Sequence, residues 1–568
     1  MAKKHAFRRW CDARDRILIV GSAALLTATA IAVELTIAPR KVHAYVALMA
    51  GQQARPLNGH FNSVPVLHSN QPEEVEGPGI LINTAPGTSY SAENGQNLQN
   101  PEFTFNGDFG IHLHHKYFPP YRAQIVQGAR RSEITLGLIL INPGLQPVHL
   151  HFTSGAIRNS FEAPYLANSL TGVRPLGHRP WNTGPGDATA VQMLRGRLDQ
   201  RLSDDVTIPA RSRIVLFSKV LPALGIANAL LRGRSDGPFQ MAVVAASNPD
   251  SDADLLAILD QGQLAPGRVY LNRIQEIQNR QIFSRVGGVA LGDSYVASVS
   301  HNLELNGPLH VPLTSTERHN FGTKDVQINP LASRMIDSSL DNVGTYGVRF
   351  DLDLNLRGEG SYELVLSHPT PTGGRPFTAF RGSLQIQTKD GTQELHVVLR
   401  SGQSLPLATL NLPAGVDYPV RLSLVYPADA TPGHLLSVVP SAQLARVQRQ
   451  EQQLDLAKAQ AERAARLKAS LAKSKSAGKS RLSVADQGPD PIPPLPSVVA
   501  DQQPHNPGLQ QPPVPPPLVP AITVPPLTFP GDPGPAVLPP PQVNQSLVDR
   551  YQQALEAQQD IMRGLMSR

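Results

Sequence analysis

The sequence predicts a mainly β fold: one or two antiparallel β-sandwich domains with minor helices, followed by a helical and proline-rich, disordered C-terminal tail. Residues 348–356 alternate strictly between apolar and polar side chains, which indicates a half-buried antiparallel strand. Turn-forming residues, such as those at 142–144, separate this run from others of similar length. After Pro440 the composition changes, because residues 441–472 lack glycine and proline and are rich in alanine, glutamine, arginine and lysine.

Further strands and two helices follow from the same patterns. A helix is expected at about 188–201, with Asp187 as its cap, and another at about 252–263. The other expected strands are residues 134–141, 213–217, 239–246, 361–367, 395–399 and 420–426.

The strand-rich region can be divided at about residues 265–285, where the second helix ends and a new series of strands begins. This boundary predicts one β-sandwich domain at 56–265 and a second at 285–440. The same pattern also fits one intertwined unit, so the number of β domains stays open.

Residues 1–44 are expected to be a signal peptide or an N-terminal membrane anchor. A basic start leads into an uncharged apolar segment from Ile17 to Val33, which is just long enough for a transmembrane helix. The sequence Val42-His43-Ala44 offers a cleavage site, so both cleavage and an uncleaved inner-membrane anchor remain open. Basic residues are more numerous before the segment than after it, which keeps the N-terminus in the cytoplasm. The rest of the chain is therefore expected in the periplasm or cell envelope.

The formal net charge of +6 is unevenly distributed. Residues 1–16 and 441–482 carry net charges of +4 and +7, whereas residues 483–568 carry −4. The β region is therefore nearly neutral, whereas a nucleic-acid-binding fold would concentrate basic residues there, so no nucleic-acid partner is expected. The single cysteine, Cys11, precedes the apolar segment, so disulfide and thiolate chemistry are not expected in the exported part.

The tail begins with a basic helix at 441–482 and continues as a proline-rich spacer at 488–542. The helix has no continuous apolar seam, which favours a solvated, charged helix over a coiled coil. The spacer contains 21 prolines and cannot form a core, so an extended polyproline-type conformation is expected. At about 3.1 Å per residue, this spacer would reach up to about 170 Å.

The chain ends in an amphipathic helix expected at 543–568. Five apolar side chains form one stripe at helical spacing, behind a spacer that offers no core to cover them. We expect this stripe to dock onto an envelope protein or a cell-wall component. The alternatives are that it folds back onto the β region or stays partly disordered. The expected partner-binding residues are Leu547, Tyr551, Leu555, Met562 and Leu565.

Two pairs of histidines are the candidate metal ligands. His112 and His114 lie two positions apart on one expected strand, and His149 and His151 lie two positions apart on another. If these strands pair, the four imidazoles share one face and can bind Zn²⁺ or Cu²⁺. The alternative is that they are polar side chains on a solvated face or are satisfied by loop carbonyls. No other cofactor is expected.

No catalytic residue is predicted, because the sequence contains neither a Gly-x-Ser-x-Gly elbow nor a His-Glu-x-x-His zinc helix. Trp181 lies in a loop where it either contacts a ligand or packs as an anchor. We therefore expect a non-enzymatic cell-envelope protein that acts as a structural or adaptor protein through its tail. The alternative is a ligand- or metal-binding module that uses the histidine strands or the Trp181 loop.

Several separated motifs occur in order between residues 56 and 440. They are Pro56-Leu57-Asn58-Gly59, Val64-Pro65-Val66, Gly79-Ile80-Leu81, residues 109–115, residues 194–197, residues 321–323, Gly344-Thr345-Tyr346-Gly347 and residues 426–432. In these motifs the chain resembles the cyanobacterial DUF3370 family, whose domain has no assigned function. The resemblance implies an exported envelope protein of cyanobacterial type and no particular activity. It ends before the helical and proline-rich tail.

Overall fold

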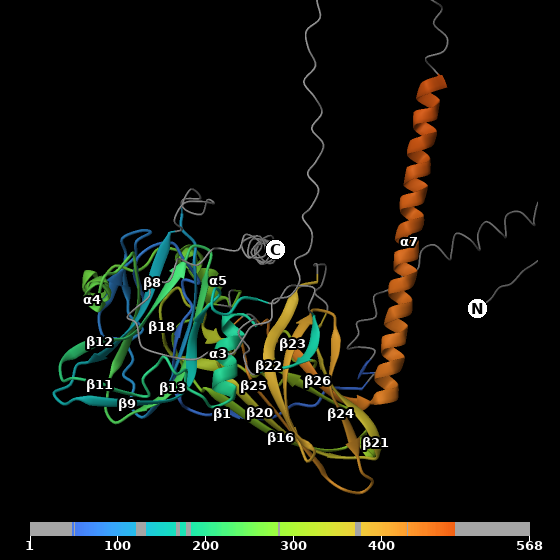
Figure 1. Cartoon of the computed structure of the whole chain (residues 1–568), viewed down its shortest axis with the longest axis horizontal. Coiled ribbons are helices and arrows are strands. Elements are labelled where there is room, and N and C mark those ends of the chain that lie inside the picture. Colours follow the sequence, from blue (N-terminus) through green and yellow to red (C-terminus); the bar gives the residue numbers. More distant parts are fainter. Residues whose placement is uncertain are drawn as a thin grey trace, which may run out of the picture. The chain divides into compact units, whose positions relative to one another are not determined.

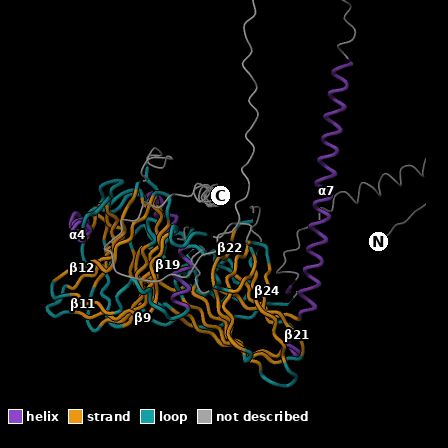
Figure 2. The backbone as a smooth tube through the Cα atoms, in the orientation of Figure 1, coloured by secondary structure: helices purple, strands orange, loops and turns teal. Residues whose placement is uncertain are grey.

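Twenty-six strands build most of the described part of the protein, whose structure is a computed structural model (Figures 1 and 2). The chain divides into two compact units, residues 1–452 and 453–568, and every one of these strands lies in the first. The structure describes residues 48–49, 52–120, 132–165, 171–177, 183–281, 285–369, 376–428 and 430–482.

The first β-sandwich packs a nine-stranded sheet against a four-stranded sheet. The larger sheet has the order β11 (Asp205–Ile208), β9 (Val148–Asn159), β13 (Ile226–Ser235), β7 (Asp108–Tyr117), β2 (Pro65–Ser69), β15 (Gly287–Leu291), β18 (Asn329–Arg334) and β19 (Asp341–Asn342), with β3 (Glu74–Val75) also on β7. The smaller sheet has the order β12 (Ser212–Pro222), β8 (Glu133–Asn142), β14 (Gln240–Ala246) and β4 (Gly79–Asn83). Buried side chains from both sheets form one core, among them Phe109, Phe152, Leu138 and Met241.

The second β-sandwich packs a seven-stranded sheet against another four-stranded sheet. The larger sheet has the order β1 (His60–Phe61), β16 (Ser294–Asn302), β20 (Arg349–Arg357), β25 (Tyr418–Val425), β22 (Thr378–Thr388), β23 (Gly391–Arg400) and β10 (Gly172–Pro175). The smaller sheet has the order β17 (Leu309–Leu313), β26 (His434–Pro440), β21 (Gly360–Ser367) and β24 (Ser404–Leu412). Phe350, Leu422, Leu364 and Leu436 are part of the core between them. A separate hairpin pairs β5 (Thr88–Tyr90) with β6 (Asn97–Gln99).

Antiparallel pairing dominates these sheets, as the sequence predicts. The parallel neighbours are β2 with β7, β3 with β7, and β16 with β20. Each sandwich draws strands from both halves of the chain: β1 and β10 join the second sandwich, whereas β15, β18 and β19 join the first. The two sandwiches, called the β body below, therefore exchange strands across residues 265–285.

The alternation expected at residues 348–356 is confirmed in β20. Val348, Phe350, Leu352, Leu354 and Leu356 are each at most 2 % exposed, whereas the intervening side chains are partly or fully exposed. The other six expected strand runs coincide with or overlap β8, β12, β14, β21, β23 and β25. A fold of mainly antiparallel sheets with few helices is therefore confirmed.

Of the two helices expected inside the β region, one is confirmed and one is misplaced. Helix α4 (Asp252–Gln261) begins after Ser251 and ends at Gly262, whose φ of 69° suits a left-handed cap. Helix α3 (Pro185–Leu194) does not begin after Asp187 and does not extend to residue 201. Its N-cap is Gly184, because proline fits the first helical position, and Asp187 is a buried residue of the first turn. The remaining short helices are η2 (Val269–Arg273), α5 (Ile274–Gln278) and α6 (Leu303–Asn306).

Helix α3 lies between the two sandwiches (Figure 1) and contacts β9 and β13 of the first and β22 and β25 of the second. At its N-terminal end, Asp187 accepts a hydrogen bond from Ser383 and lies 3.0 Å from His396 Nδ1. At its C-terminal end, Arg195 forms an ion pair with Glu394. One helix therefore fixes the two sandwiches to each other.

Helix α7 (Ser441–Leu482) follows directly from β26 and occupies the range of the expected basic helix. Leu444 and Val447 in its first turns are buried, whereas every side chain from 452 to 470 is exposed. Among the described residues, no helix is both long enough and apolar enough to cross a membrane. The leader, the proline-rich spacer and the terminal helix that the sequence predicts lie outside the described residues.

Candidate functional site

An open groove of about 1020 Å³ lies on the nine-stranded sheet, over β9, β11 and the C-terminal end of β13. Its lining includes the carboxylates of Asp108, Asp205, Asp236 and Asp293, the guanidinium groups of Arg232 and Arg234, and the imidazoles of His149 and His151. Arg232 and the nearly buried Asp293 form an ion pair at 2.5 Å, so their charges cancel. The remaining charges are more acidic than basic, which favours cations over anions in this groove.

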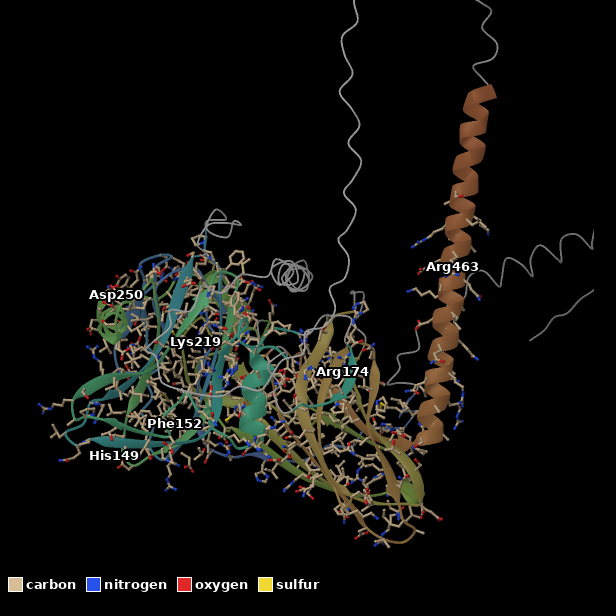
Figure 3. The ribbon with its side chains drawn as sticks, in the orientation of Figure 1. His149, Phe152, Arg174, Lys219, Asp250 and Arg463 are labelled. Carbon is tan, nitrogen blue, oxygen red and sulfur yellow. The ribbon has the colours of Figure 1, made fainter. Side chains whose placement is uncertain are left out.

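The groove exists because β9 has a solvated face over its first half. Its burial alternates from Val148 to Thr153, with His149 and His151 exposed and Leu150 and Phe152 in the core. Figure 3 labels His149 and Phe152, which belong to these two faces. The alternation places both imidazoles on one side of one strand.

The neighbouring edge strand β11 holds both imidazoles. In the antiparallel register, Asp205 lies opposite His151 and Thr207 lies opposite His149. Asp205 Oδ1 is 2.8 Å from Nδ1 of His151, and Thr207 Oγ1 is 2.9 Å from Nδ1 of His149. Because a carboxylate only accepts, Nδ1 of His151 is the donor of this hydrogen bond, and Nε2 is the ring nitrogen that Asp205 does not engage.

The sequence did not single out Asp205 and Thr207. Residues 205–207 repeat the two-residue spacing of residues 149–151, which was the available local signal. This spacing did not identify the partner strand, because pairing between strands about 55 residues apart cannot be seen in either strand alone.

His112 and His114 lie elsewhere, in the middle of β7. Strand β13 pairs with β7 on one side and with β9 on the other, so the two histidine strands do not pair with each other and the condition for a four-histidine site is not met. The structure therefore does not bring the four predicted metal ligands together. Within the described ranges, no group of three or more His, Cys, Asp or Glu side chains is arranged to hold a metal ion.

The histidines of β7 have structural partners. His112 is 1 % exposed, and its Nδ1 lies 3.2 Å from Nδ1 of His68 on the parallel strand β2. Burial lowers the pKa of His112 well below its ordinary value and that of His68 to about 3, so both rings are neutral and one donates to the other. His114 is 3 % exposed and bonds Asn228 on β13, which in turn donates to Thr189 of α3.

Two further constellations contain the residue types of hydrolases, but the first is buried and the second lacks the hydrogen bond from serine to Nε2 of the histidine. Ser69 Oγ lies 2.8 Å from Nε2 of His115, and Nδ1 of His115 donates to the carbonyl of Pro72. Both side chains are fully buried, and burial lowers the pKa of His115 to about 3. In the second constellation, the Ser383 hydroxyl donates to Asp187 and not to Nε2 of His396, as a catalytic triad requires its serine to do.

A further set of contacts joins the two ends of the β body. Leu48 packs against Val365 and Val439 of the second sandwich and against Leu444 and Val447 of α7. Gln443 Nε2 also donates to the carbonyl of Leu48 at 2.6 Å. These contacts, called the joint below, hold the N-terminal end of the β body against the root of the C-terminal helix.

The other predicted functional residues cannot be placed. The Trp181 loop and the stripe of Leu547, Tyr551, Leu555, Met562 and Leu565 lie outside the described residues.

Comparison with known proteins gives a family and no activity. No curated protein matches the chain significantly. The model of one family, described as a protein of unknown function (DUF3370), matches residues 52–440, which includes both sandwiches, the groove and the buried histidines. This range is more than half of the chain and ends where α7 begins. The chain therefore belongs to the DUF3370 family.

Proposed function

We propose that the chain is an exported, non-enzymatic protein of the cell envelope that acts as a structural or adaptor protein through its proline-rich tail and terminal helix. The joint is the observation that carries this proposal. It holds the residues that follow the apolar leader and the root of the tail at one place on the β body. The β body is thus attached to the rest of the chain at a single point.

The N-terminal side of the joint supports attachment to the inner membrane before any cleavage. Leu48 lies only fifteen residue steps after Val33, the last residue of the apolar segment. At about 3.6 Å per extended residue, an uncleaved anchor would hold the joint within about 54 Å of the bilayer.

The C-terminal side of the joint supports reach toward a second component. Helix α7 has 42 residues and is about 63 Å long at about 1.5 Å per residue. Every side chain from 452 to 470 is exposed, so none of them docks this part of the helix on a neighbouring element. The proline-rich residues 488–542 follow it and cannot form a core of their own.

The non-enzymatic part of the proposal is supported by the places where acid–base groups occur. The Ser69–His115 pair and the Asp187–His396 pair are buried, so no substrate can reach them. The exposed His151–Asp205 pair has no serine or cysteine hydrogen-bonded to its imidazole among the described residues. An imidazole–carboxylate pair without a positioned nucleophile lacks the partner that nucleophilic hydrolysis requires.

The proposal is tested by cell fractionation combined with in-cell cross-linking. The full chain is expected in the periplasmic or membrane fraction, cross-linked to an envelope component. Deletion of residues 488–568 should leave the β body exported and folded but should remove that cross-linked component.

A matched control separates the terminal helix from the spacer. Replacement of Leu547, Tyr551, Leu555, Met562 and Leu565 by serine keeps the length and the spacer but removes the apolar stripe. This variant should lose the same component as the deletion. Recovery of the full chain from the cytosol with its leader intact, or an unchanged set of cross-linked proteins in both variants, would overturn the proposal.

A further inference from the structure

We propose that His149 and His151 form a surface site for one borderline divalent transition metal ion, such as Cu²⁺ or Zn²⁺, with Asp205 and Thr207 as the groups that orient the two imidazoles. The site uses only half of the four histidines that the sequence suggests. It also adds two positioning residues from the edge strand β11 that the sequence alone does not reveal.

The spacing of the two imidazoles suits chelation by one ion. Residues two apart on a strand are about 6.6 Å apart along the chain and point to the same side. Two imidazole nitrogens bound to one tetrahedral ion at about 2.0–2.1 Å are about 3.3 Å apart. The two side chains lie on a solvated face with no core atoms around them, so each ring can tilt toward the other about its Nδ1 hydrogen bond to β11.

The hydrogen bonds to β11 prepare both rings for a metal. Ligating histidines usually donate their second ring N–H to a carboxylate or another acceptor, which fixes the tautomer and raises the basicity of the ligating nitrogen. Asp205 accepts a hydrogen bond from Nδ1 of His151, and Thr207 Oγ1 can accept one from Nδ1 of His149. Both Nε2 atoms are therefore the nitrogens that remain for an ion.

The surroundings favour a cation. Asp205 is 79 % exposed and the side chain of His151 is 57 % exposed, so an ion can reach both without any movement of the backbone. Asp236 lies beside His149, because its Oδ1 accepts a hydrogen bond from the backbone N–H of that residue at 2.7 Å. Imidazole selects Cu²⁺, Ni²⁺ and Zn²⁺ over Mg²⁺ and Ca²⁺, which prefer a shell made only of oxygen ligands.

Two protein ligands define the kind of site. With no third ligand within reach among the described side chains, water completes the coordination shell. Such a site is open and exchanges its ion readily, in contrast to a closed structural site with four protein ligands.

The test is titration of the purified full chain with Cu²⁺ and with Zn²⁺, followed by calorimetry, and by electron paramagnetic resonance for Cu²⁺. We expect one equivalent to bind and the copper spectrum to show nitrogen ligands. His149→Ala with His151→Ala should lose that equivalent, and Mg²⁺ should not compete. Asp205→Asn should weaken binding by about 10- to 100-fold, which is the usual effect of removing an orienting partner of a metal ligand.

The matched control is His60→Ala, which removes another exposed imidazole from β1 in the second sandwich. It should bind the ion like the unchanged protein. Because all four substituted positions are exposed, circular dichroism and the melting temperature should be unchanged in every variant. Undiminished binding by the double variant, or no stoichiometric binding by the full chain, would contradict the proposal.

Discussion

The histidines of β7 and β9 have the same local pattern and opposite environments. In both strands two histidines are separated by one apolar residue, Leu113 in β7 and Leu150 in β9. In β9 the alternation is visible in the fold, with the imidazoles in water and Leu150 in the core. In β7 every residue from Phe109 to Tyr117 is buried, so the alternation decides which of two cores a side chain enters and not whether it meets water.

The difference arises from what covers the outer face of the nine-stranded sheet. Helix α3 lies against β13 and the second half of β9, and Thr189 of this helix is connected to His114 through Asn228. Tyr346, from a loop between the sandwiches, stacks on His112. The first half of β9 and the edge strand β11 extend beyond this cover, and there the same sheet face becomes the groove. Position relative to α3, and not the sequence motif, thus separates a buried histidine from an exposed one.

The largest expected difference between the two pairs is chemical accessibility. Diethyl pyrocarbonate, which acylates exposed imidazoles, should modify His149 and His151 rapidly. His112 and His114 should react at least about 1000-fold more slowly, because reaching them requires opening of a core whose stability is of the order of 5 kcal/mol or more. Peptide mass spectrometry over a time course measures both rates, with exposed His60 as the reference. Similar modification rates for the two pairs would contradict the difference in burial between them.

Acid should destabilise the fold through its buried histidines. Burial lowers the pKa of His68 and His115 to about 3 and that of His310 and His368 to about 4. Below about pH 6.5 the unfolded chain binds more protons at these positions than the folded chain, so stability falls as the pH falls from about 6.5 to about 3 and is unaffected above that range. Each such group contributes a slope of about 1.4 kcal/mol per pH unit between its two pKa values. Denaturant unfolding at pH 7.5, 6, 5 and 4 measures this, and a flat profile would show that the buried rings are charged or accessible.

Alanine substitution should lower the stability of the protein more at the buried histidines of β7 than at the exposed histidines of β9. His112→Ala leaves a cavity and removes the ring that shares a hydrogen bond with His68, so we expect a loss of about 2–4 kcal/mol. His149→Ala should change the free energy of unfolding by less than about 0.5 kcal/mol, because the side chain is exposed. Urea unfolding of the two variants provides the measurement. Equal losses would mean that the outer face of β7 is not covered as described.

The smallest expected effect concerns Asp205. Its pairing with His151 is largely exposed to solvent, so Asp205→Asn should change stability by less than about 0.5 kcal/mol. The same substitution should nevertheless weaken metal binding, because it replaces a charged group that only accepts hydrogen bonds by an amide that can also donate, so Nδ1 of His151 is no longer fixed as the donor. A substantial loss of stability would show that the pair is structural and would remove the reason to treat Asp205 as a positioning residue.

Local patterns predict the strands well because burial of alternate side chains is a local property. Residues 348–356 show this, since β20 has the predicted inner and outer faces along its whole length. Helix α4 can be predicted equally well, because the residue types of Ser251 and Gly262 mark its ends. The bounds of α3 were wrong because Asp187 has the side chain of a cap but serves a partner on another sandwich.

The prediction that four histidines lie together at one site is wrong for a different reason. The sequence locates the imidazoles on strands correctly. However, β13, which lies between β7 and β9, begins 78 residues after β9 begins. The same non-local pairing supplies Asp205 and Thr207 to β9. Pair spacing along a strand can therefore be predicted, whereas the identity of the neighbouring strand depends on how the whole sheet is assembled.

The joint at Leu48 has a mechanical consequence. When a force is applied between the residues that precede Leu48 and the residues that follow the first turns of α7, it passes first through the contacts of Leu48 with Leu444, Val447 and Gln443. The hydrogen-bonded ladders of the sandwiches carry no load until these few contacts break. A force along the polypeptide would thus break these few contacts before it separates the strands of the sheets, so a brief force would leave the sheets folded.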